Sequence, residues 1–559
     1  MHLRHIWNVH GRRRQSHRNL QERRSGRPRI CRSVGSEPPA SAGASICGVV
    51  DSAAPARQLA TIVPGKGGMP HMSVPETTPA DAPAVIPSLK GWSAVAGGVR
   101  LGGGFAVAHS PELADIAATL LSDIAELTGH SGTAASEAVK GEIVLELDPQ
   151  LEFPTDNATA PAEGYVLAVD GNVRISARTS TGVYWGTRTL LQMLAASATL
   201  PGGTAVDWPN YPVRGFMLDV GRRFSRPEVL RDYIRFLSWN KLNTFMVHLN
   251  DNEITKDTGR PWKHAQQAFR LASDSPGLAG LAAEDGSYSR ADWDSFEDVA
   301  ARRHVRLVPE IDVPAHSRSF TRWRPEVGLN AGDSDMLDLG NPDSTELVKA
   351  MFDEFVPWFR GPAVHFGADE YARGHSEEYR TFFNAISSHV RSLGKDPVAW
   401  GSLTVMSDGA GTPGPDGYDR DVVVCAWNKD WYSGPAAVAD GYRVINTDDE
   451  LLYIVPFADY YHGQGLDARA LFEDWEPHVF GNGYDLQPGH PQLLGAASAV
   501  WNDLVLLAYN EQAVYDLVKP TFGVLAQKMW AGAVPGLSFE EFTARSKAVS
   551  SWPGKAFLD

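Results

Sequence analysis

Two adjacent carboxyl residues, Asp369 and Glu370, follow a short apolar run in the segment VHFGADEY. Neighbouring carboxyl groups can be held in different protonation states by their surroundings, so that one donates a proton while the other stays an anion. An Asp-Glu pair is by default a solvated surface pair, because these residues are seldom buried. The apolar run before this pair instead favours a place at the end of a buried strand, and acid–base catalysis is the chemistry that the pair would do there.

The acid pair lies within a repeating pattern of short apolar strands and amphipathic helices that begins near Trp208. This alternation is typical of a parallel sheet built from βα units, and eight units over roughly 300 residues predict a (β/α)8 barrel. The predicted strands cover residues 214–220, 243–249, 304–311, 363–369, 397–402, 422–427, 442–447 and 495–501. Residues 448–493 form a long insertion before the last strand.

Active sites of such barrels lie at the carboxyl ends of the strands. The second and third predicted strands end in HLNDNE and PEIDVPAHS, which contain Asp251 and His316. Aromatic residues stand on the fifth, sixth and eighth strands, at Trp400, Trp427 and Trp501. A single Trp is more often part of the core, but three at three strand ends indicate a pocket that contacts the apolar faces of sugar rings.

Arg214 and three histidines are open to more than one interpretation. Arg214, at the start of the first strand, is equally consistent with a clamp on sugar hydroxyls and with an ion pair inside the barrel. His248, His316 and His365 lie on separate strands without close ligand spacing or a Cys partner, which favours hydrogen bonding over a metal site. Nucleotide-binding and serine-hydrolase motifs are missing from the sequence, and we expect no metal or organic cofactor.

Two segments precede the barrel, which we assign with its C-terminal helices to residues 206–559. Residues 86–205 predict a small α+β domain, with strands in EIVLELD, GYVLAVDG and NVRISAR and helices in ELADIAATLLSDIAELTG and STGVYWGTRTLLQMLAAS. Residues 1–85 are Arg-rich and then rich in Pro, Ala and Gly, so we predict a disordered extension that cannot bury enough apolar surface to fold.

The charge distribution restricts the partners. The net charge is -16, and residues 1–34 carry ten Arg and one acidic residue, which makes the rest still more acidic. An acidic body is a poor match for nucleic acid or an anionic membrane, whereas a neutral sugar tolerates it. No apolar run is long enough to span a membrane. The basic N-terminus lacks the apolar stretch of a secretory signal, and localisation stays open between cytoplasm and export, as does the oligomeric state. Of the three Cys residues only Cys425 lies in the predicted globular part, which excludes a disulfide framework for the core.

Four ordered segments, VRGFMLDVGRRF, NKLNTFMVHLNDNE, VRLVPEIDVPAHS and VHFGADEY, resemble glycoside hydrolase family 20, the β-N-acetylhexosaminidase family. The resemblance extends over about residues 86–510 and includes the domain before the barrel. It implies a retaining hydrolysis in which the substrate's own 2-acetamido oxygen is the nucleophile. Glu370 would be the general acid and then the base, and Asp369 would orient the acetamido group and stabilise the positive charge of the intermediate.

The resemblance also implies roles around the acid pair. Arg214 would bind ring hydroxyls, and Tyr453 in LLYIV would hydrogen-bond the acetamido oxygen. The pocket walls would be Trp400, Trp427 and Trp501, and Asp503 would contact the substrate. The supporting residues behind them would be Asp251, His316 and His365.

Three positions depart from the family pattern. Ala368 replaces a Gly before the acid pair, Val455 stands where an acid is frequent, and Asp503 replaces a Glu. The forms GADEY and WND resemble the lacto-N-biosidase branch, which releases a disaccharide. One shorter acid and one missing acid would leave room for a second sugar in this chain.

The sequence therefore predicts an exo-acting enzyme on glycans with terminal β-linked N-acetylglucosamine or N-acetylgalactosamine. A lacto-N-biosidase that releases a disaccharide is the alternative within the enzyme class. An inactive sugar-binding protein is the alternative from another class, and the presence of both Asp369 and Glu370 argues against it.

Overall fold

The computed structural model describes residues 82–135, 143–407, 417–481 and 483–559. Residues 1–81 of the predicted extension, which covers residues 1–85, lie outside the described residues. Val85, the last residue of the predicted extension, is buried in the hydrophobic core. Among the described residues, no helix is long and apolar enough to cross a membrane.

A seven-stranded mixed sheet forms the small domain, with the order β1-β7-β5-β6-β4-β2-β3. Its strands are β1 (Gly91–Val99), β2 (Ala106–His109), β3 (Thr133–Ala135), β4 (Ile143–Leu147), β5 (Tyr165–Asp170), β6 (Asn172–Ala177) and β7 (Leu200–Asp207). The helices are α2 (Ala114–Thr128), α3 (Ala160–Glu163) and α4 (Ser180–Ala196), and α4 packs against α2, β5 and β6. The sequence pattern does not predict β1 and β7, because both contain paired glycines, which are poor strand formers.

Eight parallel strands close into a barrel, which confirms the predicted fold. Their order is β8-β9-β12-β13-β14-β15-β16-β18, and β18 pairs with β8 to close the ring. The strands are β8 (Val213–Asp219), β9 (Thr244–His248), β12 (Arg306–Val313), β13 (Ala363–Gly367), β14 (Asp396–Trp400), β15 (Val423–Ala426), β16 (Arg443–Asn446) and β18 (Leu493–Val500). Each overlaps one of the eight predicted strands.

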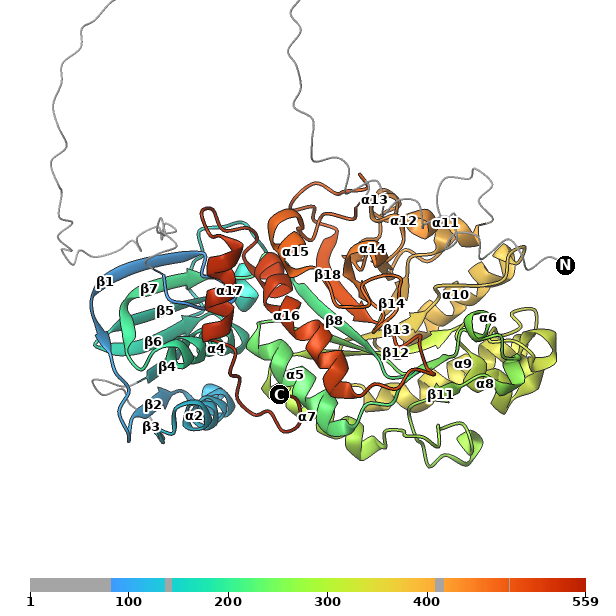
Figure 1. Ribbon diagram of the computed structural model, residues 1–559, viewed down its shortest axis with the longest axis horizontal. Helices are drawn as coiled ribbons and strands as arrows, with labels where there is room; N and C mark the ends of the chain where they lie inside the picture. Colours follow the sequence, from blue (N-terminus) through green and yellow to red (C-terminus); the bar gives the residue numbers. More distant parts are fainter. Residues whose placement is uncertain (1–81, 136–142, 408–416, 482) are drawn as a thin grey trace, which may run out of the picture. The chain divides into compact units, whose positions relative to one another are not determined.

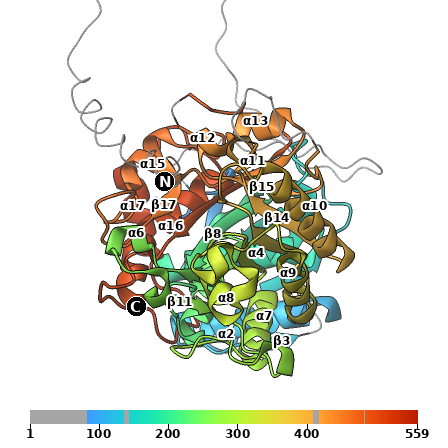
Figure 2. The same cartoon turned by 90° about the vertical axis from the view of Figure 1, so that its right-hand side faces the viewer.

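Helices connect the strands and surround the barrel. The longer ones are α5 (Pro227–Trp239), α7 (Arg290–Arg302), α9 (Pro342–Phe355), α10 (Ser376–Ser392), α16 (Glu511–Trp530) and α17 (Phe539–Ala548). Shorter helices are α6 (Thr255–Thr258), α8 (Arg318–Trp323), α11 (Leu403–Met406), α12 (Lys429–Tyr432), α13 (Gly434–Ala439), α14 (Asp449–Leu452) and α15 (Ala468–Asp474). Helices α5 and α16 lie side by side (Figure 1), with the rings of Phe236 and Phe522 5.0 Å apart. Figure 2 brings α8, α9 and α10, which follow β12 and β13, to the front.

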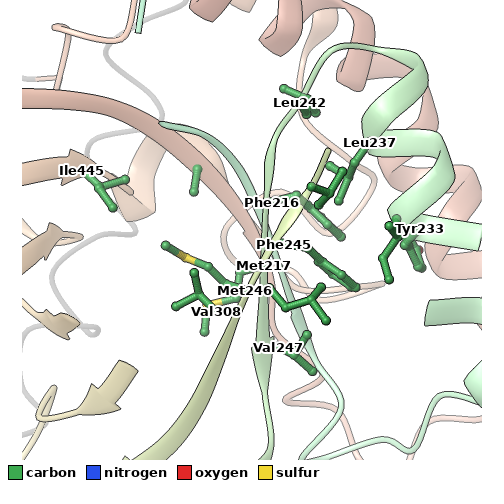
Figure 3. Packing of buried hydrophobic residues seen from close by; sticks show 14 of the residues in the cluster. Phe216, Met217, Tyr233, Leu237, Leu242, Phe245, Met246, Val247, Val308 and Ile445 are labelled. Carbon is green, nitrogen blue, oxygen red and sulfur yellow. The ribbon is translucent and has the colours of Figure 1, made fainter. Parts of the chain in front are cut away.

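Alternating side chains on the strands build two hydrophobic layers. Met217, Met246 and Val308 lie on one side of their strands, toward Ile445 of β16 (Figure 3). Phe216 and Phe245 point to the other side, where Phe216 stacks on Tyr233 of α5 at 5.4 Å. Successive side chains point to opposite faces of each strand, and both faces are covered. The sequences of these strands are therefore nearly continuous apolar runs. The rigid barrel that results fixes the positions of the loops at its carboxyl end.

Two short pairings extend the carboxyl end of the barrel. Strand β10 (Asn250–Asn252) pairs with β11 (Gln267–Phe269), and β17 (Tyr453–Ile454) pairs with β18. The first carries Asp251 and the second carries Tyr453. The long insertion of residues 448–493 is therefore partly ordered along the barrel rim.

Arg214 lies at the amino end of β8, away from the acid pair, and this corrects its predicted role in substrate binding. Its side chain is fully buried, and its Nη2 atom lies 2.6 Å from Glu163 Oε2 of the small domain. Its Nε and Nη1 atoms each donate to a backbone carbonyl at 2.8 Å, those of Lys241 and Tyr211. The guanidinium also lies 5.0 Å from the ring centroid of Trp530. All of its contacts are internal, so the ion-pair interpretation holds.

We predict that Arg214→Met lowers the free energy of unfolding by about 3–5 kcal/mol, because it leaves Glu163 without its cation in a largely buried site. The matched control is Arg174→Met, which breaks an ion pair whose side chains are 47% and 46% exposed and should cost about 1 kcal/mol or less. Denaturant unfolding measures both. Equal losses in the two variants would contradict this structural role.

Candidate active site

The acid pair is placed by a tight turn at the end of β13. Gly367 and Ala368 have φ values of 73° and 66°, in the left-handed region. A Cβ atom at Gly367 would lie 1.8 Å from Asp312 Oδ1, so only glycine fits there. Ala368 accepts this conformation at a cost of about 1–2 kcal/mol. The turn directs Asp369 and Glu370 into the carboxyl end of the barrel.

Two tyrosines hold the loop that carries the acid pair. The Tyr379 hydroxyl, on α10, donates a hydrogen bond of 2.6 Å to the carbonyl oxygen of Ala368. The Tyr371 hydroxyl donates to the carbonyl of Leu337 at 2.7 Å. Both rings are buried, and the backbone on either side of the acids is thus anchored to neighbouring segments.

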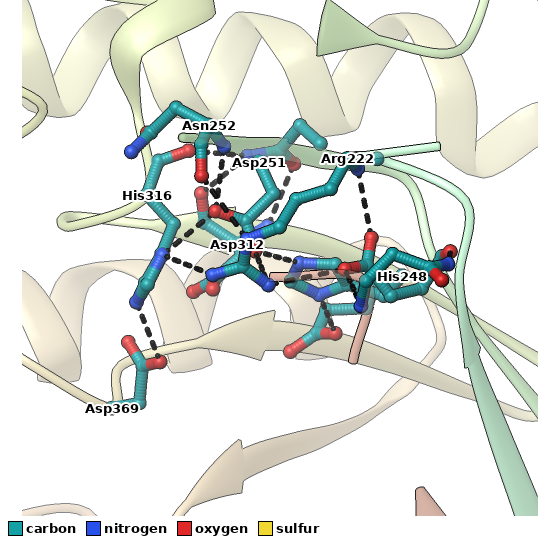
Figure 4. Close-up of polar contacts among 12 residues, drawn as sticks. Arg222, His248, Asp251, Asn252, Asp312, His316 and Asp369 are labelled. Carbon is teal, nitrogen blue, oxygen red and sulfur yellow. Dashed lines mark hydrogen bonds and ion pairs between the residues drawn. The ribbon is translucent and has the colours of Figure 1, made fainter. Parts of the chain in front are cut away.

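His316 bridges the acid pair to a buried carboxylate. Its Nε2 atom lies 3.2 Å from Asp369 Oδ2 (Figure 4) and 3.9 Å from Glu370 Oε2. Its Nδ1 atom lies 2.8 Å from Asp251 Oδ1. Burial alone would lower the pKa of His316, but the carboxylates of Asp251 and Asp369 outweigh it and raise the pKa well above its ordinary value. A cationic imidazolium therefore stands between two carboxylates.

Glu370 is the acid that keeps its proton near neutral pH. Burial raises the pKa of Glu370 to about 7; the His316 cation opposes this rise, and the charges of Asp369 and Asp335 add to it. About one-fifth of the side chain, 21%, is still exposed, so a ligand can reach it. Asp369 faces the His316 cation, with 3.2 Å between Asp369 Oδ2 and His316 Nε2. The two neighbouring carboxyl groups therefore have different surroundings, as a pair made of a proton donor and an anion requires.

Asp251 is the centre of a buried charge network. Its Oδ2 atom lies 2.7 Å from Arg222 Nη1 and 2.7 Å from His248 Nε2, while Oδ1 faces His316. Its side chain is 1% exposed. Burial would raise the pKa of Asp251, but Arg222 and His316 outweigh burial and hold that pKa far below its ordinary range. Asp251 is therefore an anion that three cationic groups surround.

Arg222, unlike Arg214, lies beside the buried carboxylates at the carboxyl end of the barrel. It lies three residues beyond the end of β8, at the carboxyl end of the barrel. Its Nη1 atom is 3.0 Å from Asp219 Oδ2 and 3.4 Å from Asp503 Oδ1. The barrel rule itself provided the missed signal, because a residue after a strand reaches the site and a residue at its start does not.

Asp503 lies beside Arg222, as expected of a residue after the last strand. The Tyr460 hydroxyl donates to Asp503 Oδ2 at 3.1 Å. Burial raises the pKa of Asp503, and the Arg222 cation partly offsets this effect. Tyr460 comes from the long insertion and was not predicted, because its segment has no periodic pattern.

Four aromatic rings that the sequence analysis singles out meet at the carboxyl end of the barrel. The Trp427 and Tyr453 rings are parallel to within 3°, with centroids 6.5 Å apart. The Trp501 centroid lies 5.5 Å from that of Tyr453 and 5.6 Å from that of Trp400. Among the described residues, the Trp501 indole nitrogen has no hydrogen-bond partner although it is buried. We refer to Trp400, Trp427, Tyr453 and Trp501 as the aromatic wall.

His365 lies beneath this wall rather than at the surface of the site. It is fully buried on β13, and its Nδ1 atom is 2.9 Å from Glu310 Oε1. Glu310, on β12, also contacts His248 and Trp400. Glu310 was not singled out from the sequence, although it stands two residues before Asp312, on the inward side of a predicted strand.

In the part of the chain that the structure describes, three groups of His and acidic side chains are close enough to hold a metal ion: Asp219–His248–Asp251, His248–Glu310–Asp312 and Asp312–His316–Asp369. In the first group, Arg222 already contacts two of the members. In the third, His316 is itself the cation beside Asp369. The expectation of no metal stays a prediction.

Two family models match the chain. "Glycosyl hydrolase family 20, catalytic domain" matches residues 211–533, and "Glycosyl hydrolase family 20, domain 2" matches residues 82–208. The barrel and its acid pair thus define a glycoside hydrolase. The chain belongs to glycosyl hydrolase family 20.

Curated relatives are similar at low identity. The chain is 25% identical over 496 residues to a lacto-N-biosidase of Bifidobacterium bifidum, with 83% of this chain and 41% of that protein covered. It is 26% identical over 417 residues to a β-N-acetylhexosaminidase of Cellulomonas fimi, with 70% and 78% covered. The chain therefore spans less than half of the first relative and about three-quarters of the second.

Solved structures share the fold. The family 20 β-N-acetylhexosaminidase of Streptomyces coelicolor A3(2) has a TM-score of 0.67 at 23% identity, with 86% of this chain and 99% of that chain covered. The N-acetyl-β-hexosaminidase of Streptomyces plicatus in complex with Thio-NAglucal has a TM-score of 0.68 at 22% identity, with 87% and 99% covered.

We predict that Asp251→Asn lowers the free energy of unfolding by about 3–5 kcal/mol, because it leaves three cationic groups without their buried anion. The variant should also lower the pKa of His316, since Asp251 is the largest influence that raises it. Denaturant unfolding and NMR titration of the imidazole measure the two effects. Asp298→Asn, at an ion pair on α7 with side chains 53% and 49% exposed, is the control and should cost about 1 kcal/mol or less. A His316 that titrates unchanged in Asp251→Asn would contradict the network.

Proposed function

We propose that the protein removes terminal β-linked N-acetylhexosamine from glycans or glycoconjugates with retention of configuration. The observation that carries this proposal is the placement of the buried Glu370 carboxyl, whose pKa burial raises to about 7, next to Asp369, whose Oδ2 atom lies 3.2 Å from His316 Nε2. The substrate itself supplies the nucleophile, so one proton donor and one anion are sufficient.

In the first step, the neutral Glu370 carboxyl donates its proton to the glycosidic oxygen. The 2-acetamido carbonyl oxygen of the substrate attacks C1, the C1–O bond breaks, and the aglycone leaves as an alcohol. Asp369 accepts a hydrogen bond from the acetamido N–H and stabilises the positive charge of the oxazolinium intermediate that forms.

In the second step, the Glu370 carboxylate takes a proton from a water molecule. The water oxygen attacks C1 on the face that the aglycone left, the bond from C1 to the acetamido oxygen breaks, and the hemiacetal retains the β configuration. Glu370 ends the cycle protonated.

The aromatic wall would hold the acetamido group and the apolar ring faces. The Trp501 indole N–H, buried and without a partner among the described residues, is available to a substrate oxygen. We assign contacts with ring hydroxyls to Arg222 and Asp503, which lie 3.4 Å apart at the carboxyl end of β8 and β18. Asp251, His316 and His365 support these groups from behind.

Release of a disaccharide is the second candidate. Val455 is fully buried and apolar where the family frequently has an acid, so no carboxylate from that position reaches the sugar. Asp503 is shorter than Glu by one methylene and is engaged by Tyr460. Both features favour space for a second sugar, and the lacto-N-biosidase relative is similar over most of this chain.

We expect Glu370→Gln to reduce turnover by at least about 10³-fold, since general acid–base catalysis contributes 10²–10⁴-fold and acts in both steps. The variant is compared with the wild type on a chromogenic β-N-acetylglucosaminide and a chromogenic β-lacto-N-bioside. Turnover of the monosaccharide substrate supports the leading proposal, and turnover of only the disaccharide substrate supports the second. If the wild type and Glu370→Gln both bind free sugar and neither turns over a substrate, both enzyme functions are contradicted and the protein is a sugar-binding protein.

The value of kcat/KM should fall as the pH rises through about 7, where Glu370 loses its proton. His316 lowers the pKa of Glu370, so His316→Gln should raise that pKa and move the alkaline limb to higher pH while it reduces the rate. The pH profiles of both proteins provide the measurement. A limb that stays in place or moves to lower pH would show that His316 does not act on Glu370 as a cation.

A further inference from the structure

Glu310 occupies a position inside the barrel that no functional role has so far explained. Its side chain is fully buried at the centre of the strands. Its carboxylate has three partners from three other strands: His248 of β9, His365 of β13 and Trp400 of β14. The carboxylate of one residue thus joins four neighbouring strands of the barrel.

The two carboxylate oxygens divide these partners. Oε2 contacts His248 Nδ1 in a short hydrogen bond. Oε1 accepts a hydrogen bond of 2.6 Å from the Trp400 indole nitrogen and lies 2.9 Å from His365 Nδ1. Burial would raise the pKa of Glu310, but the histidines outweigh burial and hold that pKa below its ordinary range. Glu310 is therefore a buried anion with both oxygens engaged.

Each partner leads directly to a group of the proposed site. Trp400 is part of the aromatic wall, and its ring centroid lies 4.9 Å from that of His365. His248, which contacts Glu310 through Nδ1, contacts Asp251 through its other ring nitrogen, with 2.7 Å between His248 Nε2 and Asp251 Oδ2. The rings of His248 and Trp501 also lie 5.0 Å apart at an angle of 87°. One carboxylate thus fixes one wall of the pocket and the anion that faces His316.

We propose that Glu310 is a positioning residue that orients the Trp400 side of the aromatic wall and the His248–Asp251 pair. The inference rests on the proposed function, because it treats the aromatic wall as the sugar pocket. Hydrogen bonds to a charged group are directional, so the buried carboxylate holds the Trp400 indole and the His248 imidazole more firmly than packing alone. Glu310 touches no reacting atom and acts through these partners.

The chain offers a matched control on the outside of the barrel. Glu297 of α7 is also a buried glutamate, and the Trp293 indole nitrogen donates to its Oε1 atom at 3.1 Å. Glu297 contacts the backbone nitrogen of Arg360 and belongs to no part of the site. Glu297→Gln thus removes a carboxylate beside an indole N–H, as Glu310→Gln does, but at a position outside the proposed site.

The experiment is a double-mutant cycle of Glu310→Gln and Trp400→Phe, with Glu297→Gln as control, on the chromogenic substrate that the wild type cleaves. Glu310→Gln should reduce kcat/KM by about 10²-fold, the effect of a displacement of about 1 Å in a site. KM should rise as part of this loss, since Trp400 contacts the sugar before reaction. A smaller folded fraction would lower only the apparent kcat. The double variant should lose little beyond the larger single effect, because the two residues act as one unit.

Crystal structures of Glu310→Gln provide a second readout that does not require turnover. The Trp400 indole should leave its wild-type orientation. Turnover of neither chromogenic substrate by the wild type would overturn the proposed function, and the orientation of Trp400 would then decide the role of Glu310. Three results would each overturn the proposal. The losses of kcat/KM in the two single variants could multiply in the double variant, or Glu297→Gln could lose as much kcat/KM as Glu310→Gln. The third is a Trp400 indole that keeps its wild-type orientation in Glu310→Gln.

Discussion

The contact of His316 with Asp251 is the interaction on which the site depends. Charges are costly to bury, and they persist only where opposite charges and hydrogen bonds surround them. Asp251 meets this condition through Arg222, His248 and His316, and His316 in turn presents its other nitrogen to the acid pair. The protonation of Glu370 is then a balance between burial, which retains the proton, and the imidazolium, which favours its release. A site without this cation would hold the proton more tightly, and a site without burial would lose it at lower pH.

The barrel makes such a network possible because its carboxyl end collects residues that are distant in sequence. Asp219 ends β8, whereas Asp251, His316 and Asp369 follow the adjacent strands β9, β12 and β13, and the closure of β18 onto β8 adds Asp503. The opposite end of the same strands has a different task. There, Arg214 and Glu163 join the barrel to the small domain through a buried ion pair. Polar residues at the two ends of one strand, Arg214 and Asp219, therefore serve stability and the site respectively.

The sequence predicts the barrel, its eight strands and the acid pair, because apolar strands and the residues after them are local patterns. It also predicts the four aromatic rings that the structure brings together. Arg214 is misassigned although the barrel rule favours an arginine that follows the strand, such as Arg222, over one at the start of the strand. Glu310 and Tyr460 are missed for other reasons: the inward direction of a strand residue depends on register, and the segment around Tyr460 has no regular period. Strands β1 and β7 are missed because their pairing, not their glycine-rich composition, makes them strands.

The proposed mechanism requires that Glu370 stays protonated near neutral pH beside Asp369. Carbon-13 NMR of protein labelled at the Glu carboxyl groups tests it most directly, with Glu370→Gln to assign the signal. We predict that the Glu370 signal titrates at about pH 7. A signal that is already that of a carboxylate at pH 5 would contradict the assignment of Glu370 as the proton donor.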